Sequence, residues 1–495
     1  MTEPLTSNSG DGSVPLADEL DRGRLGRPQL VSLAVASFIP AVGMSTAPLL
    51  FFQNGGFIAW PAAMLSMIAV IAVGLSVSVF ARRYVATGSL YSYVGKVFGP
   101  WAQVIVAAAL LLGFVMQLGG TSNIVGIYLG SFLTTLGVQN AFGFGMQALI
   151  LGLTLVIVGL IAARGLDTSL WVIVGATIVT VPVVAFITID SATTTGLHLG
   201  EQLRLADLPV SSVFQGMAAG IAFLVGFESC TALAAETRDP KRNVPLALMS
   251  VPVVLGVLYL VATFLQVPGM AATADALAAG ASPASALAGL AGLPSWFSGA
   301  ADLILAIATF AALVAFANYG SRYLATLGVD RMMPAWVKSM SRRQTPVAAI
   351  VTLLVLAYLF LMGTYAAAGD FLSSYSAVAV AIVYCWVPMY LLITAGALVL
   401  MARDRVFSPV AAIGSVVGFL AMAYLYVNGV INPPAPPADD MTWVVPLGIL
   451  VLVAAFAVAR RRVSATGADE GRATATGEDA TPLAGGTRKP GTGGT

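Results

Sequence analysis

Residues 216–229 read GMAAGIAFLVGFES and lie inside an apolar stretch that covers about residues 212–234. This stretch is long enough for a membrane-spanning helix, which needs about 20 apolar residues. Gly216, Gly220, Gly226 and Glu228 interrupt it. Glycines four residues apart often serve only to let membrane helices pack closely, and this alternative stays open for Gly216 and Gly220. The third glycine and the glutamate favour a helix that is broken inside the membrane.

A second interrupted stretch lies near the N-terminus, where residues 37–48 read SFIPAVGMSTAP. Pro40 and Pro48 each remove a helical N–H and crowd the preceding turn. Prolines that merely kink a helix are common, so a simple kink is the alternative. The two interrupted spans are the first and the sixth, and a repeat of five spans enters the membrane from opposite sides. This spacing is typical of inverted-repeat transporters, whose binding site lies between two discontinuous helices.

The composition indicates that lipid surrounds most of the chain. Of its 495 residues 58% are hydrophobic and 9% are charged, with a mean hydropathy of +0.89, whereas soluble domains have about 25% charged residues. This excludes an ordinary soluble enzyme, a disordered protein and a disulfide scaffold. The net charge of +1 gives no indication of nucleic-acid binding.

The apolar stretches predict an all-α polytopic membrane protein with twelve transmembrane helices. The predicted spans cover about residues 30–52, 58–80, 101–129, 142–162, 168–189, 212–234, 245–268, 297–317, 346–365, 372–401, 409–428 and 441–459.

The distribution of lysine and arginine predicts the orientation of these spans. Of the 24 Lys and Arg residues, all except Arg204 fall in the two tails and in alternate loops. By the positive-inside rule both termini are cytoplasmic, and we expect a multi-pass protein of the plasma membrane. Residues 1–28 are expected to form a disordered cytoplasmic tail that lacks the apolar core of a signal peptide, and residues 463–495 a second disordered tail.

Glu228 is the only acidic residue clearly inside a predicted span. An acid there usually marks function, although a carboxyl that only stabilises the bend is the alternative. Asp302, near the outer end of the eighth span, is predicted to be interfacial. The chain has one histidine, His198, and two cysteines. This scarcity predicts no catalytic cluster, no metal site and no cofactor, which argues against an enzyme.

Motifs on the predicted cytoplasmic side resemble those of the amino acid–polyamine–organocation permease superfamily. The strongest is GFES at 226–229, followed by AETRDPKRNVP at 235–245. ARRYVATGSLYSYV at 81–94 follows the second span, and NYGSRYL at 318–324 with DRMMP at 330–334 follows the eighth. In this order the motifs cover about residues 30–400.

The resemblance implies the leucine-transporter type of fold, in which spans 1–5 and 6–10 form a 5+5 inverted repeat with discontinuous helices 1 and 6. The ten-helix transport core would occupy residues 29–401, and two peripheral helices residues 402–462. The resemblance also implies secondary transport of amino acids or related amines by alternating access.

The binding site is then expected at the broken parts of spans 1 and 6. Free amides in span 1 would hold a substrate carboxylate at a half-helix N-terminus, and they belong to Val42, Gly43, Met44, Ser45 and Thr46. In span 6, carbonyls would accept from the substrate ammonium and aromatic rings would form a lid; these residues are Phe223, Leu224, Gly226 and Phe227. For the rings of Phe223 and Phe227, a role in core packing is an equally good alternative to a lid. The candidates for a cytoplasmic gate are Glu236, Arg238 and Arg322.

Two departures from the family pattern bear on mechanism. Span 1 has GMST at 43–46 in place of the common glycine–hydroxyl–glycine triplet, so its exact unwound residues stay open. Span 5 lacks the lysine that replaces a sodium ion in many relatives, and Thr177 and Thr180 lie in that region. Glu228 is then the best candidate for a coupling proton. We expect proton coupling or exchange, and sodium is less favoured.

A binding site with few charges favours a small neutral zwitterion as substrate. A permease for polyamines or other organic amines, which would need more carboxylates, is one alternative. A non-transporting sensor of the same fold is the other. The sequence leaves the oligomeric state open.

Overall fold

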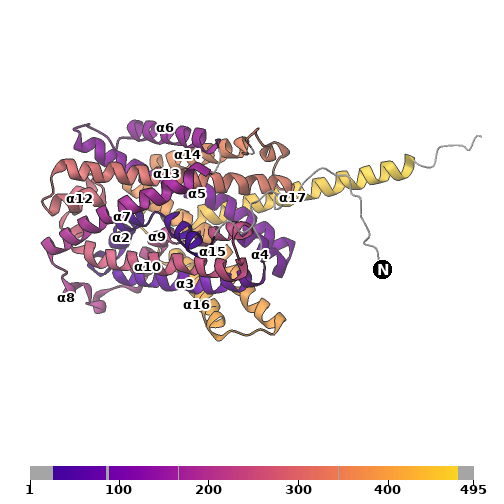
Figure 1. The fold of residues 1–495 in the computed structure, drawn as a ribbon, viewed down its shortest axis with the longest axis horizontal. Coiled ribbons are helices and arrows are strands. Elements are labelled where there is room, and N and C mark those ends of the chain that lie inside the picture. The colour runs from indigo at the N-terminus through magenta and orange to yellow at the C-terminus, as the bar shows by residue number, and fades with distance from the viewer. Residues whose placement is uncertain (1–25, 85–88, 165–166, 344, 478–495) are drawn as a thin grey trace, which may run out of the picture.

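The computed structural model describes residues 26–84, 89–164, 167–343 and 345–477, and these residues form helices and no β-strand. Eleven of the described helices are long and apolar enough to cross a membrane, and one bent pair provides a twelfth span. The long helices lie side by side in one bundle (Figure 1). This confirms the predicted all-α, polytopic class.

Each predicted span corresponds to a helix or to a group of short helices. The spans are α1 with α2 (Arg27–Ala36, Pro40–Gly55), α3 (Trp60–Arg83), α5 (Pro100–Thr135), α6 (Phe144–Ala162), α7 (Asp167–Thr195), α9 with η3 and η4 (Val210–Gly220, Ile221–Phe223, Phe227–Glu236), α10 (Pro240–Ala272), α13 (Ser295–Val329), α14 (Val347–Ala368), α15 (Phe371–Asp404), α16 (Pro409–Ile431) and α17 (Met441–Gly477). The connecting helices are η1 (Gly56–Ile58), α4 (Ser89–Phe98), α8 (Leu199–Gln202), η2 (Leu205–Asp207), α11 (Ala274–Ala278), α12 (Pro283–Leu290) and η5 (Ala335–Lys338).

The packing divides most spans into two sets. In the first helix group, α10 packs against α1, α2 and α3, and α9 packs against α2 and α3. In the second helix group, α13 and α14 pack against each other and against α5 and α6. Helix α7 contacts both groups, and α15 joins α5 to α3 and α9.

Span 1 is broken at residues 37–39, where α1 and α2 meet at an angle of 40°. Ile39 has a left-handed φ of 43°, and Pro40 is the first residue of α2. Proline suits the first helical position because that N–H has no helical partner, and it disfavours a helical conformation of the residue before it. The break therefore precedes the residues expected to be unwound. Val42 to Thr46 lie within the first two turns of α2 instead.

Span 6 is irregular over residues 221–226, between α9 and η4. The short helix η3 occupies the first half, and Gly226 ends the irregular part with a φ of +83°. Glycine tolerates this left-handed conformation without the clash that a Cβ would cause. The sequence prediction of a break beside Gly226 agrees with this geometry.

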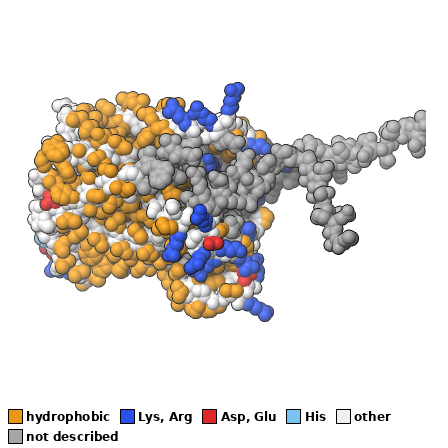
Figure 2. All heavy atoms as spheres, viewed as in Figure 1, with side chains coloured by type: hydrophobic (Ala, Val, Ile, Leu, Met, Phe, Trp, Pro, Cys, Tyr) orange, Lys and Arg blue, Asp and Glu red, His pale blue; other side chains and the backbone are white. Residues whose placement is uncertain are grey.

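Contacts between loops agree with the predicted grouping of loops by side. Arg83 at the end of α3 pairs with Asp404 at the end of α15. The Tyr91 hydroxyl donates to Asp330 after α13 at 2.5 Å. All four residues were assigned to the same side of the membrane. Figure 2 shows most of the Lys and Arg side chains of the visible face at the end of the bundle from which α17 extends in Figure 1. We refer to it as the basic end.

The last two spans lie against the rest of the bundle. Helix α16 packs against α3 and α15, and α17 packs against α5 and α15. Helix α17 continues to Gly477, and so extends into the segment from residue 463 that was expected to be disordered. Adding residues to an existing helix is easy compared with starting one, which accounts for the extension. Of the predicted tails at 1–28 and 463–495, residues 1–25 and 478–495 lie outside the described residues, and α1 begins at Arg27.

Candidate functional site

A cavity that is partly open to solvent lies between the two broken spans. Span 1 contributes its three break residues and Val42, and span 6 contributes Ala222 and Phe223. Helices α5, α13 and α15 complete the wall. Helices of both groups thus line the cavity. The residues that the first group contributes lie at or beside the breaks in spans 1 and 6.

The polar groups that line this cavity are uncharged. They belong to Ser37, Gln117, Thr121, Thr309 and Tyr375. The Gln117 Oε1 atom and the Tyr375 hydroxyl are buried without a hydrogen-bond partner among the described residues. Buried polar atoms usually have partners, so these two groups are available to a bound molecule. The remainder of the lining is aliphatic and aromatic, including Phe38, Ile39, Ile124, Phe316 and Ile382.

The residues predicted in span 1 have different surroundings, and only Val42 lines the cavity. The amides of Val42 and Gly43 both donate to the Ile39 carbonyl, at 3.0 and 3.4 Å. The prediction that these two amides are free was therefore wrong, because the helix begins earlier than expected. Thr46 donates to the Val42 carbonyl at 2.6 Å, and the buried Ser45 hydroxyl has no partner in the described part of the chain.

Two side chains of α10 support this half of span 1. Tyr259 fills the space beside Gly43, where a Cβ would lie 2.1 Å from its hydroxyl oxygen. Gln266 donates to the Met44 carbonyl at 2.9 Å and to the Thr188 hydroxyl at 2.8 Å. Gly43 and Met44 are thus positions where α2 contacts α10, and Gln266 links this contact to α7.

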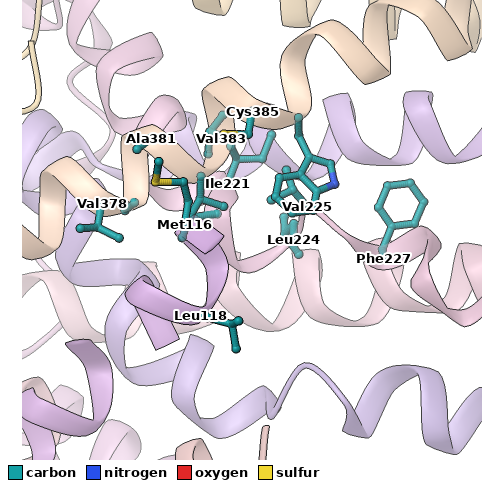
Figure 3. Close-up of a cluster of buried hydrophobic side chains, with 14 of the residues drawn as sticks. Met116, Leu118, Ile221, Leu224, Val225, Phe227, Val378, Ala381, Val383 and Cys385 are labelled. Carbon is teal, nitrogen blue, oxygen red and sulfur yellow. The ribbon is translucent and has the colours of Figure 1, made fainter. Parts of the chain in front are cut away.

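The residues predicted in span 6 divide in a similar way. Phe223 lines the cavity, whereas Leu224 and Phe227 are buried in the core. Figure 3 shows Ile221, Leu224 and Val225 among side chains of α5 and α15. The Gly226 carbonyl accepts from the Ser229 amide at 3.0 Å. The structure describes no hydrogen bond to the Leu224 carbonyl, and Leu224 does not line the cavity, so its role as an ammonium acceptor stays a prediction.

Glu228 is buried but does not line the cavity. Its two carboxylate oxygens accept from two side chains of α15, Trp386 Nε1 at 3.0 Å and the Tyr390 hydroxyl at 3.0 Å. The Tyr390 hydroxyl in turn accepts from the Gly226 amide at 3.0 Å. Glu228 therefore lies outside the lining of the cavity, two residues after the break in span 6, and is hydrogen-bonded to α15.

Trp386 and Tyr390 were not identified from the sequence. They are four residues apart, so they lie on one face of α15. Pairs of aromatic residues are common in apolar helices, and the sequence signal was therefore weak. Indole N–H and phenol O–H groups inside a span need hydrogen-bond acceptors. This need is the sequence signal that could have linked the two residues to a buried acid.

The predicted gate residues lie at the basic end of the molecule. Arg238 and Arg322 are exposed, and each interacts with a partner. The side chain of Glu236 lies outside the described residues. Close to this end, burial and the hydrogen bond to Asp330 raise the pKa of the Tyr91 phenol well above its usual value. Tyr91 thus stays neutral and holds α4 against the end of α13.

Asp302 was predicted to be interfacial, but its exposed fraction is 0%. The helices α11 and α12 connect α10 to α13, and Ser282, which precedes α12, contacts Asp302. A short polar loop would have left this acid near water. The folded connection encloses it instead, so the structure contains a second buried acid.

The fold and cavity define a class of protein. A membrane-embedded helix bundle with a cavity at two broken helices is the arrangement of secondary transporters. Comparison with known families agrees with this class. The sequence profile of the amino acid permease family matches residues 25–455, and the chain belongs to that family. This makes it a multi-pass membrane protein of a permease family rather than of an enzyme family.

One curated relative is the branched-chain amino acid permease BcaP of Lactococcus lactis subsp. cremoris (strain MG1363). The two sequences are 25% identical over 293 residues, which cover 54% of this chain and 60% of the relative. The similarity thus spans less than two thirds of the relative.

Proposed function

We propose that the protein transports small neutral amino acids across the plasma membrane by alternating access, with proton coupling or by exchange. The observation that carries this proposal is the cavity at the two breaks, whose polar lining has no charged side chain. A dibasic amine would leave a second cation in this apolar site without a carboxylate, which is unfavourable. A zwitterion needs only one acceptor region and one donor region.

In this proposal the ammonium lies toward the span 6 break, where the Leu224 carbonyl is free of backbone partners. The carboxylate lies toward the N-terminus of α2, whose dipole favours an anion. Because the amides of Val42 and Gly43 are already bonded, the Tyr375 hydroxyl, which lines the cavity without a partner among the described residues, supplies a hydrogen bond to the carboxylate. The substrate side chain then contacts the aliphatic wall formed by Ile39, Ile124 and Ile382. The name of the Lactococcus relative agrees with an apolar side chain.

The proposal includes the inverted repeat of spans 1–5 and 6–10, with both termini in the cytoplasm. The breaks in spans 1 and 6 and the concentration of Lys and Arg at one end support it. Arg238, Arg322 and Glu236 remain the proposed cytoplasmic gate.

The experiment is uptake of a panel of labelled amino acids and amines into proteoliposomes, with and without proton and sodium gradients. We expect uptake or exchange of alanine, valine and leucine, and little uptake of putrescine or lysine. Preference for putrescine would favour the polyamine alternative. If no amine-bearing compound is taken up or exchanged, the proposed substrate class is wrong. That result would favour the alternative of a non-transporting sensor.

Glu228 is the proposed proton carrier, because it is a buried acid that follows the irregular part of span 6. Glu228→Gln keeps an oxygen that accepts from Trp386 but cannot release a proton. We expect proton-driven accumulation to disappear while exchange of substrate continues. Glu201→Gln, at an exposed acid of the outer connection, is the matched control and should accumulate substrate normally. Full proton-driven accumulation by Glu228→Gln would assign Glu228 a structural role.

A further inference from the structure

The ends of helices α3 and α15 come together at the basic end of the molecule. Helix α4 packs against α15, and α16 packs against both α3 and α15. Arg83, the last residue of α3, pairs with Asp404, the last residue of α15. Arg403 Nε lies 3.7 Å from the same carboxylate. Two arginines and one acid thus join the two helix ends.

Three cations of this region lie around a single tyrosine, Tyr84, which follows α3. The Arg403 Nη2 atom donates to the Tyr84 hydroxyl at 3.3 Å. Lys96 Nζ of α4 lies 4.3 Å from the centre of the Tyr84 ring, and Arg83 Cζ lies 5.7 Å from it. Aromatic rings attract cations at such distances. We call Arg83, Tyr84, Lys96 and Arg403 the Tyr84 cluster.

The Tyr84 cluster carries more positive charge than the described acids neutralise. In the part of the chain that the structure describes, the acid that pairs with these cations is Asp404, so three cations share one carboxylate. Arg83, Lys96 and Arg403 are all exposed. The described hydrogen bonds give the Tyr84 hydroxyl a donor but no acceptor. Cations held this close repel one another, and an anion that contacts them would lower the repulsion.

Exposed apolar side chains lie beside the cluster. Val406 and Phe407 follow closely after Arg403, and they are 67% and 72% exposed. Trp101, in the first turn of α5, is 57% exposed, and its ring contacts that of Phe98 at the end of α4. In Figure 2, Lys and Arg side chains at the basic end border hydrophobic surface. Aromatic residues beside cations at the ends of spans are typical of the membrane–water interface.

We infer that the Tyr84 cluster binds the phosphate headgroup of an anionic phospholipid in the leaflet at the basic end. The two guanidinium groups suit a phosphodiester, whose oxygens accept paired N–H groups. The Tyr84 hydroxyl donates a further hydrogen bond, and the acyl chains lie over the exposed Val410 and Ile413 of α16. Cations next to a surface that faces acyl chains favour a lipid over a soluble phosphate. Such binding needs only the membrane location of the bundle, and not the proposed transport.

The test compares an anionic lipid with a zwitterionic one. The purified protein in a non-ionic detergent is titrated with phosphatidylglycerol or with phosphatidylcholine of the same acyl chains, and bound lipid is measured by native mass spectrometry. We expect phosphatidylglycerol to bind about tenfold more tightly, because several cations attract its net charge. Glycerol 3-phosphate is the soluble probe and should compete weakly. Equal binding of the two lipids, or displacement of phosphatidylglycerol by an equal concentration of glycerol 3-phosphate, would contradict a lipid site.

Two double variants locate the bound lipid. Lys96→Gln with Arg403→Gln removes two cations of the cluster, and we expect phosphatidylglycerol to bind this variant about tenfold more weakly. Lys241→Gln with Arg242→Gln removes the same charge from exposed residues in the first turn of α10 and should keep the parent affinity. If both double variants lose affinity equally, the overall charge of the basic end attracts the lipid, and the inference is wrong.

The unfolding temperature, measured with each lipid, separates binding from misfolding. Phosphatidylglycerol should raise this temperature for the parent and for the α10 variant, but not for Lys96→Gln with Arg403→Gln. In phosphatidylcholine the three proteins should unfold at similar temperatures. Tyr84→Phe keeps the ring but removes the hydroxyl donor, and it should bind phosphatidylglycerol about threefold more weakly. If phosphatidylglycerol stabilises all of these proteins equally, the lipid binds elsewhere and the inference is overturned.

Discussion

The break in span 1 covers residues 37–39, whereas the break in span 6 covers residues 221–226. The amides of Phe38 and Ile39 donate to carbonyls of their own α1, at 3.2 and 2.9 Å. In the second break the Leu224 and Val225 amides also donate to a local carbonyl, that of Ile221, but the Gly226 amide donates to Tyr390 of α15. Local sequence therefore determines the first break, and a distant helix stabilises the second. Substitutions in the two breaks should differ accordingly in how they affect stability and transport.

The largest effect on stability is expected from Tyr390→Phe. This change removes the acceptor of the Gly226 amide and one donor to Glu228, both of which are buried. We expect the free energy of unfolding to fall by about 2–3 kcal/mol, measured as a lower unfolding temperature of the purified protein. Tyr384→Phe is a matched control on the same helix, because the Tyr384 hydroxyl has no partner among the described residues. Equal unfolding temperatures of the two variants would contradict the role given to Tyr390.

A smaller effect is expected from Gly226→Ala. The nearest atom to an added Cβ is a Trp386 ring atom at 3.5 Å, so space is adequate and the φ of +83° is the main obstacle. We expect a loss of about 1–2 kcal/mol in the free energy of unfolding, with slower uptake. Gly363→Ala, inside α14 with open space around it, should be neutral or slightly stabilising. A Gly226→Ala protein as stable as Gly363→Ala would mean that the break does not need the left-handed residue.

The smallest effect on stability is expected in span 1, from Pro40→Ala. Without proline, residue 39 can become helical and α1 can join α2. Since the break bonds to its own neighbours, we expect the free energy of unfolding to change by less than about 1 kcal/mol while uptake falls. Pro48→Ala, farther along α2, should affect uptake less. Normal uptake by Pro40→Ala would show that the proline is not what maintains the break.

The sequence predicted the spans well, because a long apolar run in lipid has few alternatives to a helix. It located the break in span 6, where Gly226 needs a conformation that few residues adopt. In span 1 it predicted an interruption within residues 37–48 and left the exact residues open, and the break lies at 37–39, directly before Pro40. The contacts of Glu228 depend on residues 158 and 162 positions away. The burial of Asp302 depends on the fold of a connection that has no strong pattern. Neither can be deduced from local sequence.

The Tyr390 hydroxyl accepts from the Gly226 amide and donates to the Glu228 carboxylate. The hydrogen bonds of this one oxygen atom thus depend both on the backbone conformation at Gly226 and on the protonation state of Glu228. If substrate binding at Phe223 shifts Gly226, it changes the free energy of proton binding at Glu228. By linkage, proton binding at Glu228 then changes the free energy of substrate binding by the same amount. Under the proposed proton coupling, this one phenol would make substrate and proton mutual effectors without direct contact between them.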